Sequence, residues 1–432
     1  MKIESKLLKK LLNYCKRVVD RKSTMPILSS VRLEASDGKL TIAATDLNSW
    51  LHLTAPCQGS LATVQVELAT LLTVTDAKKA PTVNLAVTYS DDTDQPACET
   101  EHPIEGAAVR CHKHAGHDGE HEAYSSITHD DVTWTGPAKQ QAPLPKVPTL
   151  CVAVGARRFQ LAVPYRDKDW PKSSALVEHK GTSLHVTYDD PTQLASALAY
   201  VLPAVSTDES RPILNGALLS GMTLTGTDGH RLHRAGVSNT PAISDKYQRI
   251  FSRNGAFALP PMLADATKGS KISLEIFEDK SAIRWIVQLD DGATAELWCH
   301  PIEAQFPSYE QVIPALDSLT VTAEGKVAAL REAFTFAAKM APNKSGGVEC
   351  VLGDGKLAIS TDDLDRGVVV EEVPLLRSEG TSTFGVSARY VIDALAIDAH
   401  TITMANDGDA LSPLRFDSPD GSRLAVVMPT RI

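Results

Sequence analysis

The sequence repeats one pattern of elements three times, and this repetition constrains the fold more than any other feature. In each copy, two runs of alternating apolar residues are separated by a turn, and the second run ends in Thr-Asp. Alternation with a period of two predicts a β-hairpin. We therefore expect hairpins at 25–46, 211–228 and 346–362.

Helical patterns flank each hairpin. Apolar residues at helical spacing precede the hairpins at 7–19, 192–206 and 330–337. A second set of helices is expected after them at 66–77, 260–268 and 387–396. Each unit then closes with strands that end near a proline, at 161–164, 297–301 and 426–429. The pattern predicts an α+β fold in which helices lie on one face of antiparallel sheets.

The repeats divide the chain into domains at 1–182, 183–316 and 317–432. The first domain is longer than the others because its pattern stops near residue 89 and resumes near 149. The insertion, about 90–148, is rich in cysteine and histidine, and its last part, 136–148, is rich in proline and glutamine. That last part is typical of a flexible connector.

Charge and cysteine content bear on the class of protein. With 43 Lys and Arg against 53 Asp and Glu, the formal net charge is −10. A uniformly spread negative charge would repel nucleic acid. No apolar run is long enough to cross a membrane, and the seven cysteines are scattered. The sequence therefore predicts a cytoplasmic protein with free thiols and no membrane partner.

Several short motifs recur at matching places in the repeats. The most specific are Thr-Asp-Gly-His-Arg-Leu at 227–232 and the terminal Val-Val-Met-Pro-Thr-Arg-Ile at 426–432. Supporting motifs are Pro-Ile-Leu at 26–28, Ala-Thr-Asp-Leu at 44–47, Leu-Asn-Gly at 214–216 and Phe-Pro-Ser-Tyr at 306–309. In this order, they resemble the bacterial DNA sliding clamp, the β subunit of DNA polymerase III. The resemblance covers nearly the whole chain except the insertion.

The resemblance implies half of a closed ring of six domains. Two chains would form a head-to-tail homodimer that encircles double-stranded DNA, with the helices lining the hole. Such a clamp tethers a DNA polymerase and other clients as a processivity factor, and a clamp loader opens it. It is not an enzyme and requires no cofactor.

Basic residues on the first helix of two repeats fit this expectation, because phosphates are held by Lys and Arg without sequence readout. The alternative is that they are only the solvated face of amphipathic helices. The middle helix, 192–206, carries no Lys or Arg. The expected DNA-binding residues are Lys6, Lys9, Lys10, Lys16, Arg17, Arg21, Lys22, Arg211, Lys326, Arg331 and Lys344.

The resemblance also implies a cleft between the second and third domains that accepts a short client peptide. Apolar residues would form its pocket, and methionine adapts to varied ligands. Without the resemblance, the motif at 227–232 is an ordinary hairpin turn. The expected cleft residues are Leu214, Thr227, Gly229, His230, Arg231, Leu232, Pro307, Val312, Val426, Val427, Met428, Pro429, Thr430 and Arg431.

For the dimer interface, the resemblance points to Phe159 and Leu161 on one side and to Lys339 and Met340 on the other. These residues could equally belong to the domain cores.

The insertion is not explained by the resemblance. Cys98, His102, Cys111 and His114 could bind a structural zinc ion, since zinc favours cysteine and histidine ligands. The alternative is a solvated, histidine-rich loop. A different function, a zinc-dependent hydrolase with its site in the insertion, would need a general base beside the metal. Glu120 and Glu122 are near, but the sequence contains no His-Glu-x-x-His motif.

Overall fold

We describe a computed structural model of the chain. It covers residues 1–20, 23–76, 80–89, 148–172, 182–237, 244, 247–279, 282–341, 346–363 and 367–431, together with the backbone of four strands between 101 and 136.

The repeated pattern is present in the structure. The first helices of the repeats are α1 (Ser5–Cys15), α3 (Pro191–Val201) and α5 (Val327–Met340). The second helices are α2 (Leu68–Asp76), α4 (Arg253–Ala264) and α6 (Ala388–Ala394). Antiparallel hairpins form at each expected place: β2 (Ser30–Ser36) with β3 (Lys39–Thr45), β14 (Gly216–Ser220) with β15 (Thr223–Thr227), and β23 (Gly347–Gly353) with β24 (Lys356–Asp363). The α+β prediction is therefore confirmed.

Several helix ends differ from the sequence prediction, most of all in α4. Helix α4 begins at Arg253, well before the expected start at residue 260, and Pro260 and Pro261 lie inside its last turns. The hydroxyl of Ser252 caps its N-terminus by accepting a hydrogen bond from the Gly255 amide, which favours the earlier start. Helix α1 ends at Cys15, and the chain continues in a turn that still buries Val18.

Two large sheets each combine strands from neighbouring repeats, so the repeats are joined by backbone hydrogen bonds. One sheet has the strand order β13-β18-β19-β20-β4-β3-β2-β5, and the other has β21-β17-β14-β15-β16-β30-β29-β28-β22-β26. The antiparallel junctions pair β4 (Ser49–Pro56) with β20 (Thr294–Cys299), and β16 (Arg231–Gly236) with β30 (Arg423–Val427). The remaining strands of these sheets are β5 (Leu61–Glu67), β13 (Ser183–Tyr188), β17 (Arg249–Ser252), β18 (Ile272–Phe277), β19 (Ile283–Gln288), β21 (Pro301–Ile302), β22 (Val321–Lys326), β26 (Arg377–Glu379), β28 (Thr401–Asn406) and β29 (Leu414–Asp417).

A four-stranded sheet lies in each of the two terminal repeats. The first has the order β1-β6-β11-β12, and the other has β25-β24-β23-β27. Within the described residues, β12 and β25 are therefore edge strands. The strands not yet defined are β1 (Lys2–Glu4), β6 (Thr82–Tyr89), β11 (Pro148–Val154), β12 (Arg157–Ala162), β25 (Gly367–Pro374) and β27 (Ser382–Ser387).

The insertion leaves and re-enters the first domain at one point. Tyr89, the last residue of β6, is the register partner of Pro148, the first residue of β11. The backbone between them contains two antiparallel hairpins, β7 (Glu101–Ile104) with β8 (Ala107–Arg110), and β9 (Gly119–Tyr124) with β10 (Asp131–Gly136). The expected limits of the insertion agree with this arrangement.

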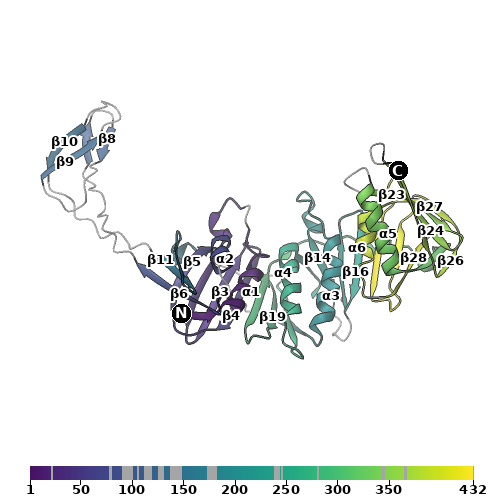
Figure 1. The fold of residues 1–432 in the computed structure, drawn as a ribbon, viewed down its shortest axis with the longest axis horizontal. Coiled ribbons are helices and arrows are strands. Elements are labelled where there is room, and N and C mark those ends of the chain that lie inside the picture. The colour runs from purple at the N-terminus through teal and green to yellow at the C-terminus, as the bar shows by residue number, and fades with distance from the viewer. Residues whose placement is uncertain are drawn as a thin grey trace.

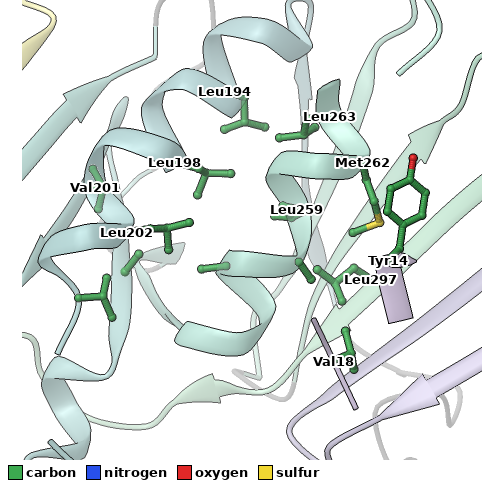
Figure 2. Close-up of a cluster of buried hydrophobic side chains, with 14 of the residues drawn as sticks. Tyr14, Val18, Leu194, Leu198, Val201, Leu202, Leu259, Met262, Leu263 and Leu297 are labelled. Carbon is green, nitrogen blue, oxygen red and sulfur yellow. The ribbon is translucent and has the colours of Figure 1, made fainter. Parts of the chain in front are cut away.

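The helices of the described residues follow one another in the order α2, α1, α4, α3, α6, α5, on one side of the sheets (Figure 1). Leu194, Leu198 and Leu202 of the α3 region face Leu259 and Leu263 of α4 in the buried core of the middle repeat (Figure 2). Tyr14 from the first repeat lies beside Met262 on the other flank of α4 (Figure 2). Helix packing therefore continues across the boundary between repeats.

The expected domain limits at 182 and 316 stay a prediction that agrees with the strand order. Strand β13 begins at Ser183, and β22 begins at Val321 after a 3-10 turn at Leu316–Ser318. We use these limits to name the domains below. No helix of the described residues is long and apolar enough to cross a membrane.

Candidate functional site

The basic residues of the first helix lie together. Helix α1 buries its apolar face, and its basic face borders α4 of the second domain. An open depression of about 840 Å³ at this border is lined by Lys6, Lys9, Lys10, Lys16 and Arg17, with Pro261 and Asp265 on the α4 side. Within the described residues, Lys6, Lys16 and Arg17 form no ion pair. These three remain available to an anionic ligand.

Lys10 does not fit the expected role as a phosphate ligand. Its ammonium group lies 2.6 Å from Asp290 and 2.7 Å from Asp291, both in the second domain. Partial burial opposes the charged form, but hydrogen bonds to the two carboxylates outweigh it and raise the pKa of Lys10. Lys10 therefore ties the first domain to the second. Lys9 is also paired, with Asp76 at 2.6 Å.

Arg211 is not placed with the α1 group. Its guanidinium is 2.8 Å from Asp208, and a side chain built on Gly229 would approach it, so it lies beside the turn at 227–231. Hydrogen bonds from Ser210 and then from Arg211 lower the pKa of Asp208 to about 2. Arg211 therefore lies apart from the α1 group, and its contact with DNA stays a prediction.

Among the other expected DNA ligands, Lys326 precedes α5 and Arg331 is on it, both exposed. Helix α3 presents no basic side chain, and Lys271 nearby is paired with Asp189 at 3.0 Å. Arg21, Lys22 and Lys344 lie outside the described residues.

The expected cleft residues meet where the second and third domains share a sheet. In the junction of β16 with β30, Arg231 is opposite Val427, and Leu232 is opposite Val426. The chain then continues past β30, where the Met428 amide donates to the His230 carbonyl at 2.9 Å. The motifs at 227–232 and 426–430, far apart in sequence, are thereby brought side by side.

The turn that begins this edge has a specific geometry. Gly229 has φ +89°, a conformation that L side chains rarely adopt. The carboxylate of Asp228 accepts hydrogen bonds from the amides of His230, at 2.9 Å, and Arg231, at 3.0 Å. The turn leaves the His230 side chain exposed at the rim. Any other residue at position 229 would therefore strain the backbone of this turn.

An apolar cluster forms the floor under these residues. It contains Leu232 and Val426 of the predicted set, together with Leu218, Ile250, Phe306, Tyr309 and Leu424. Beside it, a depression of about 970 Å³ is lined by Leu218, Ile250, Phe306, Tyr309 and the predicted Pro307. Val312 and Met428 are exposed at 49% and 36%, respectively. The candidate peptide cleft therefore has an apolar floor and a depression beside it whose lining also includes polar and charged residues.

Val427 does not line this cleft. Alternate residues of a strand point to opposite faces of the sheet. Val426 joins the apolar cluster on the outer face, whereas Val427 is fully buried in the main core beneath the helices. The expectation that both valines line the pocket is therefore wrong.

Arg231 also has a different role from the one expected. Its guanidinium bonds Asp228 at 3.0 Å, Asp393 of α6 and the carbonyl of Pro203, and lies 4.3 Å from the Tyr390 ring centre. Only 11% of its side chain is exposed. Arg231 thus joins the second domain to the third and is not a free hydrogen-bond donor at the rim.

The expected interface residues divide into buried and exposed ones. Leu161 is 8% exposed and belongs to the main core, and Phe159 is half-buried against that core. Lys339 is exposed, and Met340 is half-buried at the end of α5. Both Phe159 and Leu161 lie on the edge strand β12.

The expected zinc ligands cannot be placed. Cys98, Cys111 and His114 lie outside the described residues, as does the side chain of His102. Elsewhere, the described residues contain no cluster of potential metal ligands. A zinc site in the insertion stays a prediction that elemental analysis of purified protein would test.

Comparison with known proteins agrees with this geometry. Residues 1–89 match the family model for the N-terminal domain of the DNA polymerase III β subunit. A β sliding clamp from Caulobacter vibrioides is 25% identical, covering 100% of this chain and 99% of the relative. The chain is a relative of the bacterial β sliding clamps. The resemblance drawn from the sequence motifs is therefore confirmed.

Solved structures of sliding clamps share the fold. The DNA polymerase III β subunit from Pseudomonas aeruginosa superposes with a TM-score of 0.71 at 21% identity, covering 100% of both chains. The β subunit from Thermotoga maritima gives a TM-score of 0.72 at 19% identity, covering 100% of this chain and 99% of that one. At this level of identity, the likeness supports the clamp fold alone.

Some residues of these surfaces were not singled out from the sequence. Phe306 and Tyr309 belong to the cleft floor, and the Phe-Pro-Ser-Tyr motif was a usable signal for them. Asp393 and the pair Asp290 and Asp291 hold the domain junctions, but nothing in their local sequence indicates distant partners.

Proposed function

We propose that two copies of this chain close into a ring around duplex DNA. The observation that carries this proposal is the continuity of the sheets. At both junctions within the chain, strands of one domain extend the sheet of the next, and one four-stranded sheet is left at each end. A second copy placed head to tail would use the same kind of junction and pair the edge strands β12 and β25.

The two edge strands are suited to each other. Strand β12 begins with exposed Arg157 and Arg158, and β25 carries Glu371 and the exposed Glu372. Val368 and Val370 on β25 are 68% and 60% exposed, which is unusual for β-branched residues on a sheet edge. Pairing of β12 with β25 of a second copy would bring the arginines of β12 near Glu371 and Glu372, of which Glu372 already pairs with Lys356 at 2.6 Å.

In this ring, the helices would line the hole. Lys6, Lys16 and Arg17 of each copy would contact phosphates without reading bases, which permits sliding. The overall charge of −10 is compatible with this role, since Lys6, Lys16 and Arg17 lie together at one surface depression. The chain would hold DNA by enclosure and perform no catalytic step.

The cleft between the second and third domains would bind clients. Its floor of Leu232, Val426, Phe306 and Tyr309 is apolar, and the turn at 227–231 provides a polar rim. A short peptide with hydrophobic anchors fits such a surface. A DNA polymerase would be tethered there, and a clamp loader would open the ring.

Three measurements test the proposal. Sedimentation equilibrium should give twice the chain mass, electron microscopy should show rings, and the loaded protein should increase polymerase processivity on primed circular DNA. The purified protein should release no product from DNA or nucleotides on its own. A monomer at all concentrations, or processivity unaffected by loading, would contradict the proposal.

A further inference from the structure

An aromatic residue occupies the tenth position of the first helix in every repeat. These residues are Tyr14 in α1, Tyr200 in α3 and Phe336 in α5. The three helices also match at their buried positions. The fourth residues are Leu8, Leu194 and Leu330, and the eighth are Leu12, Leu198 and Phe334, all almost fully buried. The tenth positions are therefore equivalent in structure as well as in number.

The first two aromatics make the same kind of contact. The hydroxyl of Tyr14 donates to Asp265, just past the end of α4, at 2.6 Å. The hydroxyl of Tyr200 donates to the carbonyl of Ala394, the last residue of α6, at 3.4 Å. Each tyrosine thus reaches the C-terminal end of the second helix of the following domain. Both are buried, with exposures of 3% and 2%.

Phe336 is at the same position but is 47% exposed. Among the described residues, no domain follows α5 in the way that α4 and α6 follow α1 and α3, and the ring is left uncovered. The ring borders an open depression of about 860 Å³, which is also lined by Arg331, Lys339 and Glu371. Because Glu371 lies on the edge strand β25, this depression is continuous with the surface on which the ring proposal depends.

We propose that Phe336 packs against the C-terminal half of α2 in a second copy of this chain. This would be the third interdomain contact of the same type, after those made by Tyr14 and Tyr200. The inference rests on the proposed ring. At each junction in the chain, a first helix contacts the second helix of the next domain, α1 with α4 and α3 with α6. In a head-to-tail dimer, the next domain after α5 is the first domain of the partner, and its second helix is α2.

Helix α2 presents a surface that can receive an aromatic ring. Its exposed residues Thr70 and Thr73 are short, which leaves space over the helix. The Thr73 hydroxyl donates to the Ala69 carbonyl at 2.9 Å, and the Thr70 hydroxyl donates to Glu67. Since both hydroxyls are already bonded within the helix, their methyl groups are left for contact with an apolar partner. Phenylalanine, which has no hydroxyl to satisfy, suits this surface.

Asp76 at the end of α2 adds charge complementarity. Its carboxylate pairs with Lys9 at 2.6 Å and is half-exposed. On α5, Arg331 and Lys339 lie on either side of Phe336 in sequence and line the same depression. The aromatic contact would therefore be flanked by an acidic group on one helix and basic groups on the other.

The decisive experiment compares Phe336→Asp with Leu411→Asp. Leu411 is 62% exposed in the same domain and does not line the depression beside Phe336, so it controls for the loss of an exposed apolar residue. Sedimentation equilibrium should show that F336D dissociates at a concentration at least about tenfold higher than the natural chain. L411D should match the natural chain. Because Phe336 is exposed in the single chain, monomeric F336D should have the same melting temperature as the monomeric natural chain.

The outcomes separate this inference from the ring proposal. A natural chain that is monomeric at every concentration overturns the ring. A stable natural dimer in which F336D and L411D dissociate equally overturns the role of Phe336 and leaves the ring intact. As an independent check, Phe336 can be replaced by p-benzoylphenylalanine and irradiated in the dimer. The cross-link should map to residues 68–76 of the other copy, and a cross-link to any other element would contradict the contact with α2.

Discussion

The phenol oxygen of Tyr14 lies 2.6 Å from a carboxylate oxygen of Asp265, so a single hydrogen bond joins α1 of the first domain to the end of α4 in the second. Burial of the phenol and the bond to Asp265 raise the pKa of Tyr14, so the hydroxyl remains protonated as a donor. The contact therefore stabilises the junction between the first two domains.

Tyr14→Phe should lower the free energy of unfolding by about 1.5–3 kcal/mol, the range for a hydrogen bond to a charged group. The ring still fills its site, so the loss reports on the hydroxyl. Urea unfolding followed by circular dichroism measures the change. Tyr165→Phe, at a half-exposed tyrosine, is the control and should be near neutral. Equal effects of the two substitutions would argue against the contact.

Lys16→Ala should weaken binding to a short duplex and reduce the slope of log K against log salt by about one. Lys10→Ala should leave that slope unchanged, because Asp290 and Asp291 already neutralise Lys10. Titrations of labelled duplex at several salt concentrations test both. A slope that falls for K10A as much as for K16A would mean that Lys10 leaves its carboxylates to bind phosphate.

Arg231→Ala should destabilise the junction of the second and third domains by about 1–3 kcal/mol, because the partly buried carboxylates of Asp228 and Asp393 would lose their partner. Arg377→Ala, at an exposed position, should have little effect. Urea unfolding of both variants provides the measurement. If R231A were as stable as R377A, the contacts of Arg231 with Asp228 and Asp393 would contribute nothing to the free energy of unfolding.

Acid should lower the free energy of unfolding through His233, which lies on β16 at the junction of the second and third domains. Burial lowers its pKa to about 4, and its Nδ1 lies 2.7 Å from the Tyr200 carbonyl. In the unfolded chain, the pKa of His233 is about 6.5. As the pH falls from 6.5 to 4, the unfolded chain binds a proton that the folded chain does not, so the free energy of unfolding decreases. The loss amounts to about 3 kcal/mol over that range.

His233→Asn keeps a donor for the Tyr200 carbonyl but cannot titrate. It should be less stable than the natural chain at pH 7.5 and should show a smaller loss between pH 6.5 and 4.5. His52, whose pKa is also lowered by burial, contributes to the same pH range and is unchanged in both proteins. Parallel stability curves for the two proteins would exclude His233 as the source.

Met428→Lys should weaken binding of a hydrophobic client peptide by about tenfold or more, because Met428 is partly exposed beside the cleft floor. Met222→Lys is a matched control, since Met222 is 50% exposed but outside the predicted cleft. Fluorescence anisotropy with a labelled peptide measures both affinities. Equal affinities for M428K and M222K would exclude Met428 from the peptide site.

Local patterns in the sequence predicted most of the fold. Hairpins and helices depend on spacing within a few residues, and the threefold repetition supports each assignment. The early start of α4 was missed because Pro260 and Pro261 suggested a helix start, whereas Ser252 supplies the cap. The cleft was predicted only in part. Val427 was misassigned because the face of a strand depends on its register with β16.

The roles of Lys10 and Arg231 could not be predicted from local pattern. Their partners Asp290 and Asp393 are distant in sequence, and a basic residue has the same appearance whether it faces solvent or a carboxylate of another domain. By contrast, the equivalence of Tyr14, Tyr200 and Phe336 is readable from the sequence once the helix starts are known.

The pairing of Tyr89 with Pro148 has a consequence for how this chain can vary. A segment whose two ends are neighbours in a sheet can be lengthened, shortened or exchanged without moving any strand of the body. The entropic cost of closing such a loop rises by only about 0.6 kcal/mol for each doubling of its length. The insertion is thus a separable addition, and selection can act on it and on the clamp body independently.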